Sequence, residues 1–167
     1  MSRRIFTVVF LLVMTLPGPT MAARHTGGNT GIGFVLGDPD GLSLKFWGKG
    51  EQAVQIRLGS PGAFNAFTFT ATLAHHFEPF AVKDDSYSIP FYIGGGFRGS
   101  AMASSFTYLD GGLVGVIGTS VFVKELPVEF FLEVRPVVAL YDDAVGVSGS
   151  LHLGIQTEGA LGIHYYF

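Results

Sequence analysis

Cysteine is absent from the 167-residue sequence, and only 14% of the residues are charged. A chain without cysteine has no disulfides, no thiolate catalysis and no cysteine-based metal site. The charged fraction is low, because ordinary soluble domains have about 25%. Long hydrophobic runs are also absent after residue 23. Residues 24–167 therefore contain no membrane-spanning helix, which needs roughly 20 consecutive apolar residues.

The residues that are abundant do not suit a soluble protein either. Glycine occurs 24 times and phenylalanine 16 times, and the mean hydropathy is +0.42. A closed β-barrel reconciles this apolar character with the lack of a membrane helix, because its alternating strands turn apolar side chains to one face only. Closing the sheet also leaves no backbone group unpaired in hydrocarbon.

The start of the chain has the pattern of an export signal. Arg3 and Arg4 precede an apolar run over residues 5–16, and prolines and small residues follow. The run is too short to span a bilayer. It predicts a cleaved signal peptide over residues 1–23 and a single mature domain over residues 24–167. The mature chain would have 8 basic and 13 acidic residues, a formal charge of −5, which does not favour nucleic-acid binding.

Alternation of apolar and polar residues is clearest from Val128 to Pro136. A helix would scatter the charges of this segment around its axis, so the period of two predicts a strand. Eight such strands, an even number, predict an all-β fold, an eight-stranded antiparallel up-and-down transmembrane β-barrel in the bacterial outer membrane. The other seven predicted strands are Gly31–Gly37, Leu42–Trp47, Ala53–Gly59, Phe67–Phe77, Ile89–Arg98, Gly112–Val123 and a last strand ending at Phe167.

Turn residues separate the predicted strands. Tight turns are expected at residues 38–41, 48–50 and 124–127, where glycine, proline and aspartate are concentrated. With both ends of the mature chain in the periplasm, three of the four outward connections are among the longer ones. The longer connections are expected at residues 60–65, 78–87, 100–110 and 140–156.

The predicted inward face carries most of the ionisable side chains in the strands. Ionised groups are costly in lipid, so a mixed-charge interior is their natural place. About eight strands give an interior just wide enough to be filled by side chains, which favours a structural network over a channel. Basic groups outnumber acidic ones, so a weak anion preference is expected if water threads the interior. The predicted network consists of Lys45, Arg57, Arg98, Glu129, Glu133, Arg135 and His164.

Two motifs in the sequence are rejected as functional sites. Gly94, Gly96 and Gly99 have the spacing of a dinucleotide-binding loop, but no helix pattern follows them. His75 and His76 are adjacent, so a strand would send their side chains to opposite faces and prevent joint metal binding. We expect no cofactor and no metal.

Two other classes of protein remain open. A soluble periplasmic barrel of lipocalin type would bind an apolar ligand inside, with the apolar face inward and the charged face outward. A lipid A-modifying outer-membrane enzyme would need an acid/base or nucleophile constellation near the outer leaflet. No motif supports this constellation, and we expect no enzyme. Its candidate residues lie in the two longest outward loops and are Ser104, Ser105, Asp110, Asp143 and His152.

Four stretches resemble a largely uncharacterised family of small bacterial outer-membrane β-barrel proteins, similar in style to the OmpA- and OmpX-like eight-stranded barrels. They are Gly31–Trp47, Pro90–Arg98, Phe131–Pro136 and Gly162–Phe167, in the expected order. The resemblance implies the fold and no known activity.

The end of the chain carries a second resemblance. Tyr165 and Phe167 finish an aromatic terminal strand that is similar to the recognition signal of outer-membrane barrels, whose last residue is usually phenylalanine. The partners implied are outer-membrane lipid and the barrel assembly machinery, and we expect a monomer.

Overall fold

The computed structural model describes residues 28–48, 50–60, 66–77, 86–103, 107–142 and 151–167. The predicted signal peptide lies outside these residues. Among the described residues no helix is long and apolar enough to cross a membrane. The strands are β1 (Thr30–Gly37), β2 (Asp40–Trp47), β3 (Gln52–Ser60), β4 (Ala66–Phe77), β5 (Tyr87–Ser88), β6 (Phe91–Ala103), β7 (Thr107–Val123), β8 (Val128–Asp142) and β9 (Leu151–Tyr166).

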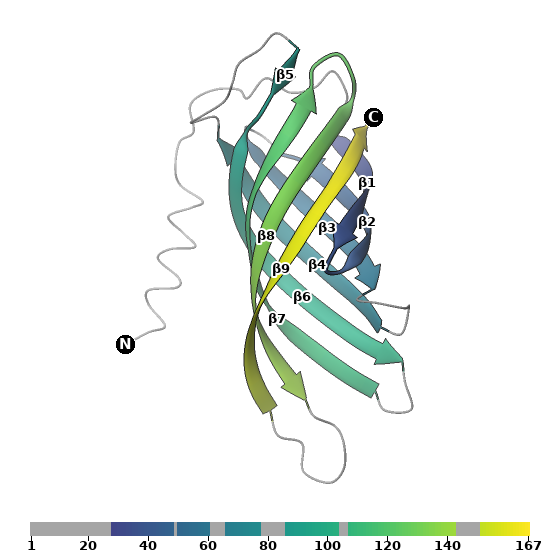
Figure 1. The fold of residues 1–167 in the computed structure, drawn as a ribbon, viewed down its shortest axis with the longest axis vertical. Helices are drawn as coiled ribbons and strands as arrows, with labels where there is room; N and C mark the ends of the chain where they lie inside the picture. The colour runs from purple at the N-terminus through teal and green to yellow at the C-terminus, as the bar shows by residue number, and fades with distance from the viewer. Residues whose placement is uncertain (1–27, 49, 61–65, 78–85, 104–106, 143–150) are drawn as a thin grey trace, which may run out of the picture.

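Eight of these strands form one closed antiparallel barrel. Each of the strands β1 to β4 and β6 to β9 pairs with its neighbours along the chain, and β9 pairs back onto β1. The strands run obliquely around the barrel, and the two-residue β5 lies at one end (Figure 1). This topology confirms the predicted all-β, eight-stranded up-and-down barrel.

Pro90 breaks the strand that the sequence predicted to start at Ile89. β5 pairs with β7 just before the break, and β6 begins after it at Phe91. Proline has no backbone N–H to donate to a sheet. The Pro90 carbonyl still accepts, from the Ser120 backbone N–H at 3.0 Å and from the Thr119 hydroxyl at 3.1 Å.

Two of the predicted long loops are largely strand. β6 continues to Ala103 and β7 starts at Thr107, so the connection expected at residues 100–110 is wrong. The connection expected at 140–156 shortens in the same way, because Asp142 of β8 pairs with Leu151 of β9. The serines, glycines and aspartates of these segments resemble turn residues in the sequence, but pairing with a neighbouring strand overrides such weak preferences.

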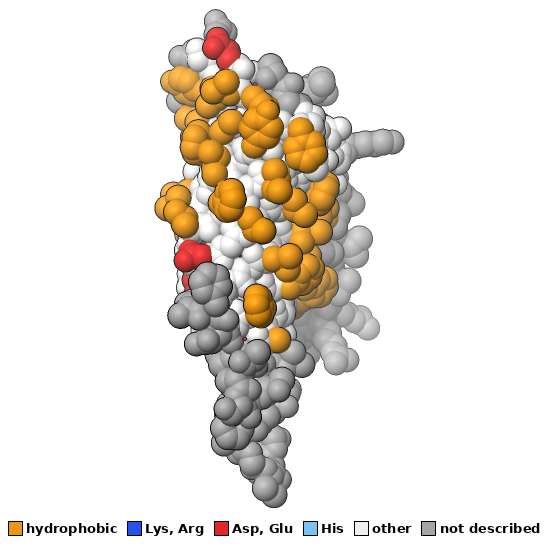
Figure 2. Space-filling view, turned by 90° about the vertical axis from the view of Figure 1, so that its right-hand side faces the viewer, with side chains coloured by type: hydrophobic (Ala, Val, Ile, Leu, Met, Phe, Trp, Pro, Cys, Tyr) orange, Lys and Arg blue, Asp and Glu red, His pale blue; other side chains and the backbone are white. Residues whose placement is uncertain are grey.

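The alternation of side chains places apolar groups outside and charged groups inside the barrel. On β8, Phe130 and Leu132 are 49% and 58% exposed, whereas Glu129 and Arg135 are at most 1% exposed. Hydrophobic side chains gather in a broad band on the outer face in Figure 2. We call the side-chain-filled interior of the barrel the lumen.

Glycines on the inner wall make room for large rings on the neighbouring strand. A Cβ at Gly162 would lie 2.4 Å from the Phe131 ring and 2.5 Å from the Phe34 carbonyl oxygen. A Cβ at Gly118 would lie 2.5 Å from the Tyr92 ring. All three distances are too short for real contacts, so these rings pack directly on glycine backbone.

Replacing Gly162 by alanine is therefore expected to lower the free energy of unfolding by about 1–3 kcal/mol, because neither Phe131 nor the Phe34 backbone can retreat without strain. Gly159→Ala on the same strand is the matched control, since a Cβ there meets nothing within 4 Å. Urea unfolding of both variants in detergent micelles measures the difference. Equal stability of the two variants would contradict the packing described here.

Candidate functional site

Three buried carboxylates organise the charged interior of the barrel. Glu129 and Glu133 project inward from β8, and Glu158 projects inward from β9. None is more than 2% exposed. Such groups are tolerated only with charged or hydrogen-bonding partners, and each of the three is paired with at least one cation.

Glu129 receives the largest number of these interactions. One of its oxygens lies 2.6 Å from the Lys45 ammonium of β2 and also accepts from the Ser120 hydroxyl of β7. The other lies 3.2 Å from Nδ1 of His164 and accepts from the Tyr166 hydroxyl, both on β9. One carboxylate thus ties together strands from opposite sides of the barrel.

Aromatic rings surround the ammonium group of Lys45. Its Nζ lies 4.9 Å from the centroid of the Trp47 ring, 5.3 Å from that of Tyr92 and 5.9 Å from that of Phe122. The same Nζ lies 3.2 Å from Nε2 of His76. Ring faces attract cations at such distances. The buried ammonium is therefore held by one carboxylate and by a set of π faces.

Glu133 and Glu158 bind the arginines of the lumen. Glu133 accepts from Arg57 of β3 and, at 2.7 Å, from the Tyr92 hydroxyl. Glu158 accepts from Arg98 of β6 through one oxygen. Its other oxygen lies 3.6 Å from Nη1 of Arg135.

All seven residues of the predicted lumen network are buried at inward positions, none more than 8% exposed. The predicted excess of basic groups is wrong, however, because Glu158 and Asp110 are buried there as well. The four cations Lys45, Arg57, Arg98 and Arg135 thus face four carboxylates in the described strands. Sequence reasoning missed Glu158 because residues 140–156 were expected to form a loop, which left the start of the last strand undefined. The alternation of Leu153, Ile155, Leu161 and Ile163 along β9 is the signal that could have placed Glu158 on the inward face.

The adjacent histidines lie on opposite sides of β4, as expected. His76 is fully buried and stacks on Tyr92 at 4.6 Å between ring centroids. His75 lies 3.7 Å from a carboxylate oxygen of Glu51. In the part of the chain that the structure describes, no group of three potential ligands is arranged to hold a metal ion.

The candidate residues of the enzyme alternative are only partly described. Ser104, Ser105 and Asp143 lie outside the described residues. Asp110 is buried at 7% exposure on β7, and His152 is exposed on β9. These two environments differ, and the described residues supply no assembled catalytic constellation.

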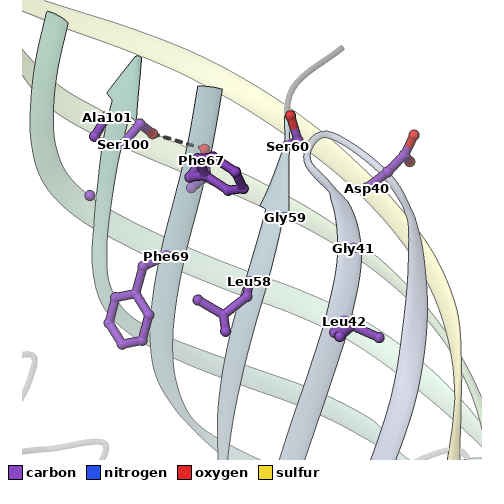
Figure 3. Close-up of a pocket in the computed structure, with 12 residues that line it drawn as sticks. Asp40, Gly41, Leu42, Leu58, Gly59, Ser60, Phe67, Phe69, Ser100 and Ala101 are labelled. Carbon is purple, nitrogen blue, oxygen red and sulfur yellow. Dashed lines mark hydrogen bonds between the residues drawn. The ribbon is translucent and has the colours of Figure 1, made fainter. Parts of the chain in front are cut away.

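The outer wall carries a shallow apolar groove of about 640 Å³ across β2, β3, β4 and β6. Leu42, Leu58 and Phe69 lie in a row on three neighbouring strands (Figure 3). The small residues Gly59 and Gly99 also line the groove. An apolar chain could lie in it, and Asp40 at its edge is the only charged group among the described residues that line it.

Comparison with protein-family models, with curated proteins and with solved structures gives no match for this chain.

Replacing Tyr166 by phenylalanine removes one donor to Glu129 and is expected to lower the free energy of unfolding by about 1.5–3 kcal/mol, the usual worth of a hydrogen bond to a charged group. Glu129→Gln should cost more, about 3–5 kcal/mol, because it leaves Lys45 buried without its counter-ion. Urea unfolding measures both. Tyr165→Phe is the control, since Tyr165 is 55% exposed on the outer face and should change stability by less than about 0.5 kcal/mol.

Proposed function

We propose that this chain is an outer-membrane β-barrel protein with a side-chain-filled lumen and a structural or surface-interaction role, with no reaction assigned. The observation that carries the proposal is the inverted distribution of polarity in the barrel. Phe67, Leu132 and Leu161 are 53–65% exposed on the outer wall, while the charged network is buried inside. This arrangement suits a barrel whose outer wall contacts lipid.

The network also supports a closed lumen. Side chains from β2, β3, β4 and β6 to β9 meet across the interior in hydrogen bonds and ion pairs. A soluble barrel that carries an apolar ligand needs the reverse arrangement, with an apolar interior. The groove of Leu42, Leu58 and Phe69 adds apolar surface to the outer wall, where an acyl chain of a membrane lipid would lie.

A charged substitution on the outer wall tests this proposal. Leu132→Arg, near the middle of β8, should lower the free energy of unfolding from lipid vesicles by about 2–4 kcal/mol, because the arginine would face hydrocarbon. Leu126→Arg is the matched control, because Leu126 is 55% exposed, close to the 58% of Leu132, but lies in the turn between β7 and β8. Similar small losses for both variants would contradict the proposal and favour a water-soluble barrel.

Cell fractionation tests the location directly. The protein should be released from the envelope by detergent only, and its electrophoretic mobility should change on heating, as expected for a stable closed barrel. Release by osmotic shock in a soluble form would favour the periplasmic carrier instead. Altered lipid A on overproduction would favour the enzyme.

We further propose that Tyr165 and Phe167 present the assembly signal. Tyr165 lies on the outer face of β9 and Phe167 directly follows the last residue of this strand, and their side chains are 55% and 67% exposed. The Phe167 backbone N–H donates to the Thr30 carbonyl at 3.0 Å, where β9 meets β1 at the closing seam. A monomer suits this seam, since the strand that carries the signal is paired within the same chain.

Phe167→Ala is expected to reduce the heat-modifiable form in cells several-fold and to leave refolding of the purified protein in micelles unchanged. Phe97→Ala is the control, because Phe97 is 68% exposed on the outer wall, against 67% for Phe167. Equal loss in both variants would mean that a general loss of apolar surface, and not a terminal signal, causes the defect.

A further inference from the structure

Arg135 is the least satisfied charged group of the lumen. Its side chain is 1% exposed on the inward face of β8. Among the described residues, none of its three guanidinium nitrogens has a hydrogen-bond partner. The 3.6 Å between its Nη1 and the nearer Glu158 oxygen is an ion-pair distance that is too long for a good hydrogen bond. A buried guanidinium with five unused N–H donors is strongly destabilising unless something accepts from it.

Further unpaired polar atoms belong to the groups around Arg135. Glu158 accepts from Arg98 through Oε1, while its Oε2, 3.6 Å from Nη1 of Arg135, has no hydrogen-bond partner among the described residues. Nε of Arg98 and Nη1 of Arg57 also have no hydrogen-bond partner among the described residues. Thr70 of β4 is the register partner of Arg57 on β3 and of Arg98 on β6, so it stands between these two arginines. Its hydroxyl also has no hydrogen-bond partner among the described residues.

The charges in this part of the lumen do not balance. Three guanidinium groups, those of Arg57, Arg98 and Arg135, face the two carboxylates of Glu133 and Glu158. The surplus is one positive charge.

Asp110 is the only other acid buried on the inward face of the described strands toward this end. It lies in register with Ser100, one inward position beyond Arg98, and its Oδ1 has no hydrogen-bond partner among the described residues. It makes no ion pair with these arginines in that part of the chain. Asp110 brings the described lumen to four cations and four carboxylates, so the surplus beside Arg135 is local and is not a surplus of the whole lumen.

We propose that the lumen holds one small monovalent inorganic anion, of the size of chloride, between Arg135, Arg98 and the hydroxyl of Thr70. Water would accept from the unpaired N–H groups, but it would leave the positive charge uncompensated in a dry interior. An anion supplies both the acceptor and the missing charge, and guanidinium groups with free N–H donors bind anions well. This site goes beyond the proposed membrane role and does not depend on where the barrel resides.

Bromide diffraction tests the site in the unmodified protein. Crystals of the full barrel grown or soaked in bromide should show an anomalous peak in contact with Arg135 and Arg98. Density for water alone at that place, with no anomalous signal, would overturn the proposal. This measurement needs no variant and therefore does not depend on whether a substituted chain folds.

Thermal unfolding in micelles gives an independent test. At constant ionic strength, replacing gluconate by chloride should raise the unfolding midpoint of the wild type by on the order of 5 °C once the site is saturated. Arg135→Met should abolish this rise. Lys45→Met is the matched control, because it removes another buried lumen cation, one that already has Glu129 as partner, and it should keep the rise.

Equal midpoints of the wild type in chloride and gluconate would overturn the proposal, as would a chloride effect that survives in Arg135→Met. Failure here would leave the fractionation result untouched, because that experiment reports on the outer wall and this one on the lumen.

Discussion

The structure depends on keeping ionised side chains out of contact with the barrel's surroundings while giving most of them a partner inside. Glu129 is the centre of this arrangement, since donors from β2, β7 and β9 converge on its two oxygens. A buried ion pair is often no more stabilising than well-packed apolar residues, but removal of one partner is costly. We therefore regard the network as a determinant of which strands meet in which register, more than as a source of net stability.

The partners of the network are far apart along the chain. Lys45 and Glu129 are separated by 84 residues, and Arg57 and Glu133 by 76. Neither pair can form until the barrel is nearly closed. A partly assembled sheet would thus leave these charges unpaired. Because they gain their partners only on closure, we expect the barrel to close in a single cooperative step.

Alternation in the sequence was sufficient to predict the fold and most of the residues that line the lumen. β8 displays apolar and charged residues in strict turn, and this pattern alone predicts which faces Glu129, Glu133 and Arg135 take. Glu158 was missed because residues 140–156 were expected to form a loop, although Leu153, Ile155, Leu161 and Ile163 continue the alternation on both sides of it. The length of the loop expected at residues 100–110 was overestimated. Most of these residues are in strands because β6 and β7 pair with each other, and their local preferences do not reveal this.

Partners across the lumen were beyond sequence reasoning. Which cation meets Glu133 depends on the stagger of eight strands, and a single chain carries no direct signal of that stagger. The aromatic rings over Gly162 and Gly118 lie closer at hand, because Phe131 pairs with Gly162 and Tyr92 with Gly118 on neighbouring strands, but their register is also not visible in a single sequence. The interruption at Pro90 could have been foreseen, since proline lacks the N–H that a continuous strand would use.

The unequal strand lengths have a consequence for immersion depth. β1 ends at Gly37, which pairs with Ala160, so in the described part of the chain no strand lies on the β1 side of β9 from Leu151 to Glu158. Backbone groups along that free edge need water. In a bilayer, the hydrocarbon boundary on this side would have to pass close to Gly159. The ends of β8 and β9 beyond it would then project into the aqueous phase on one side of the barrel only.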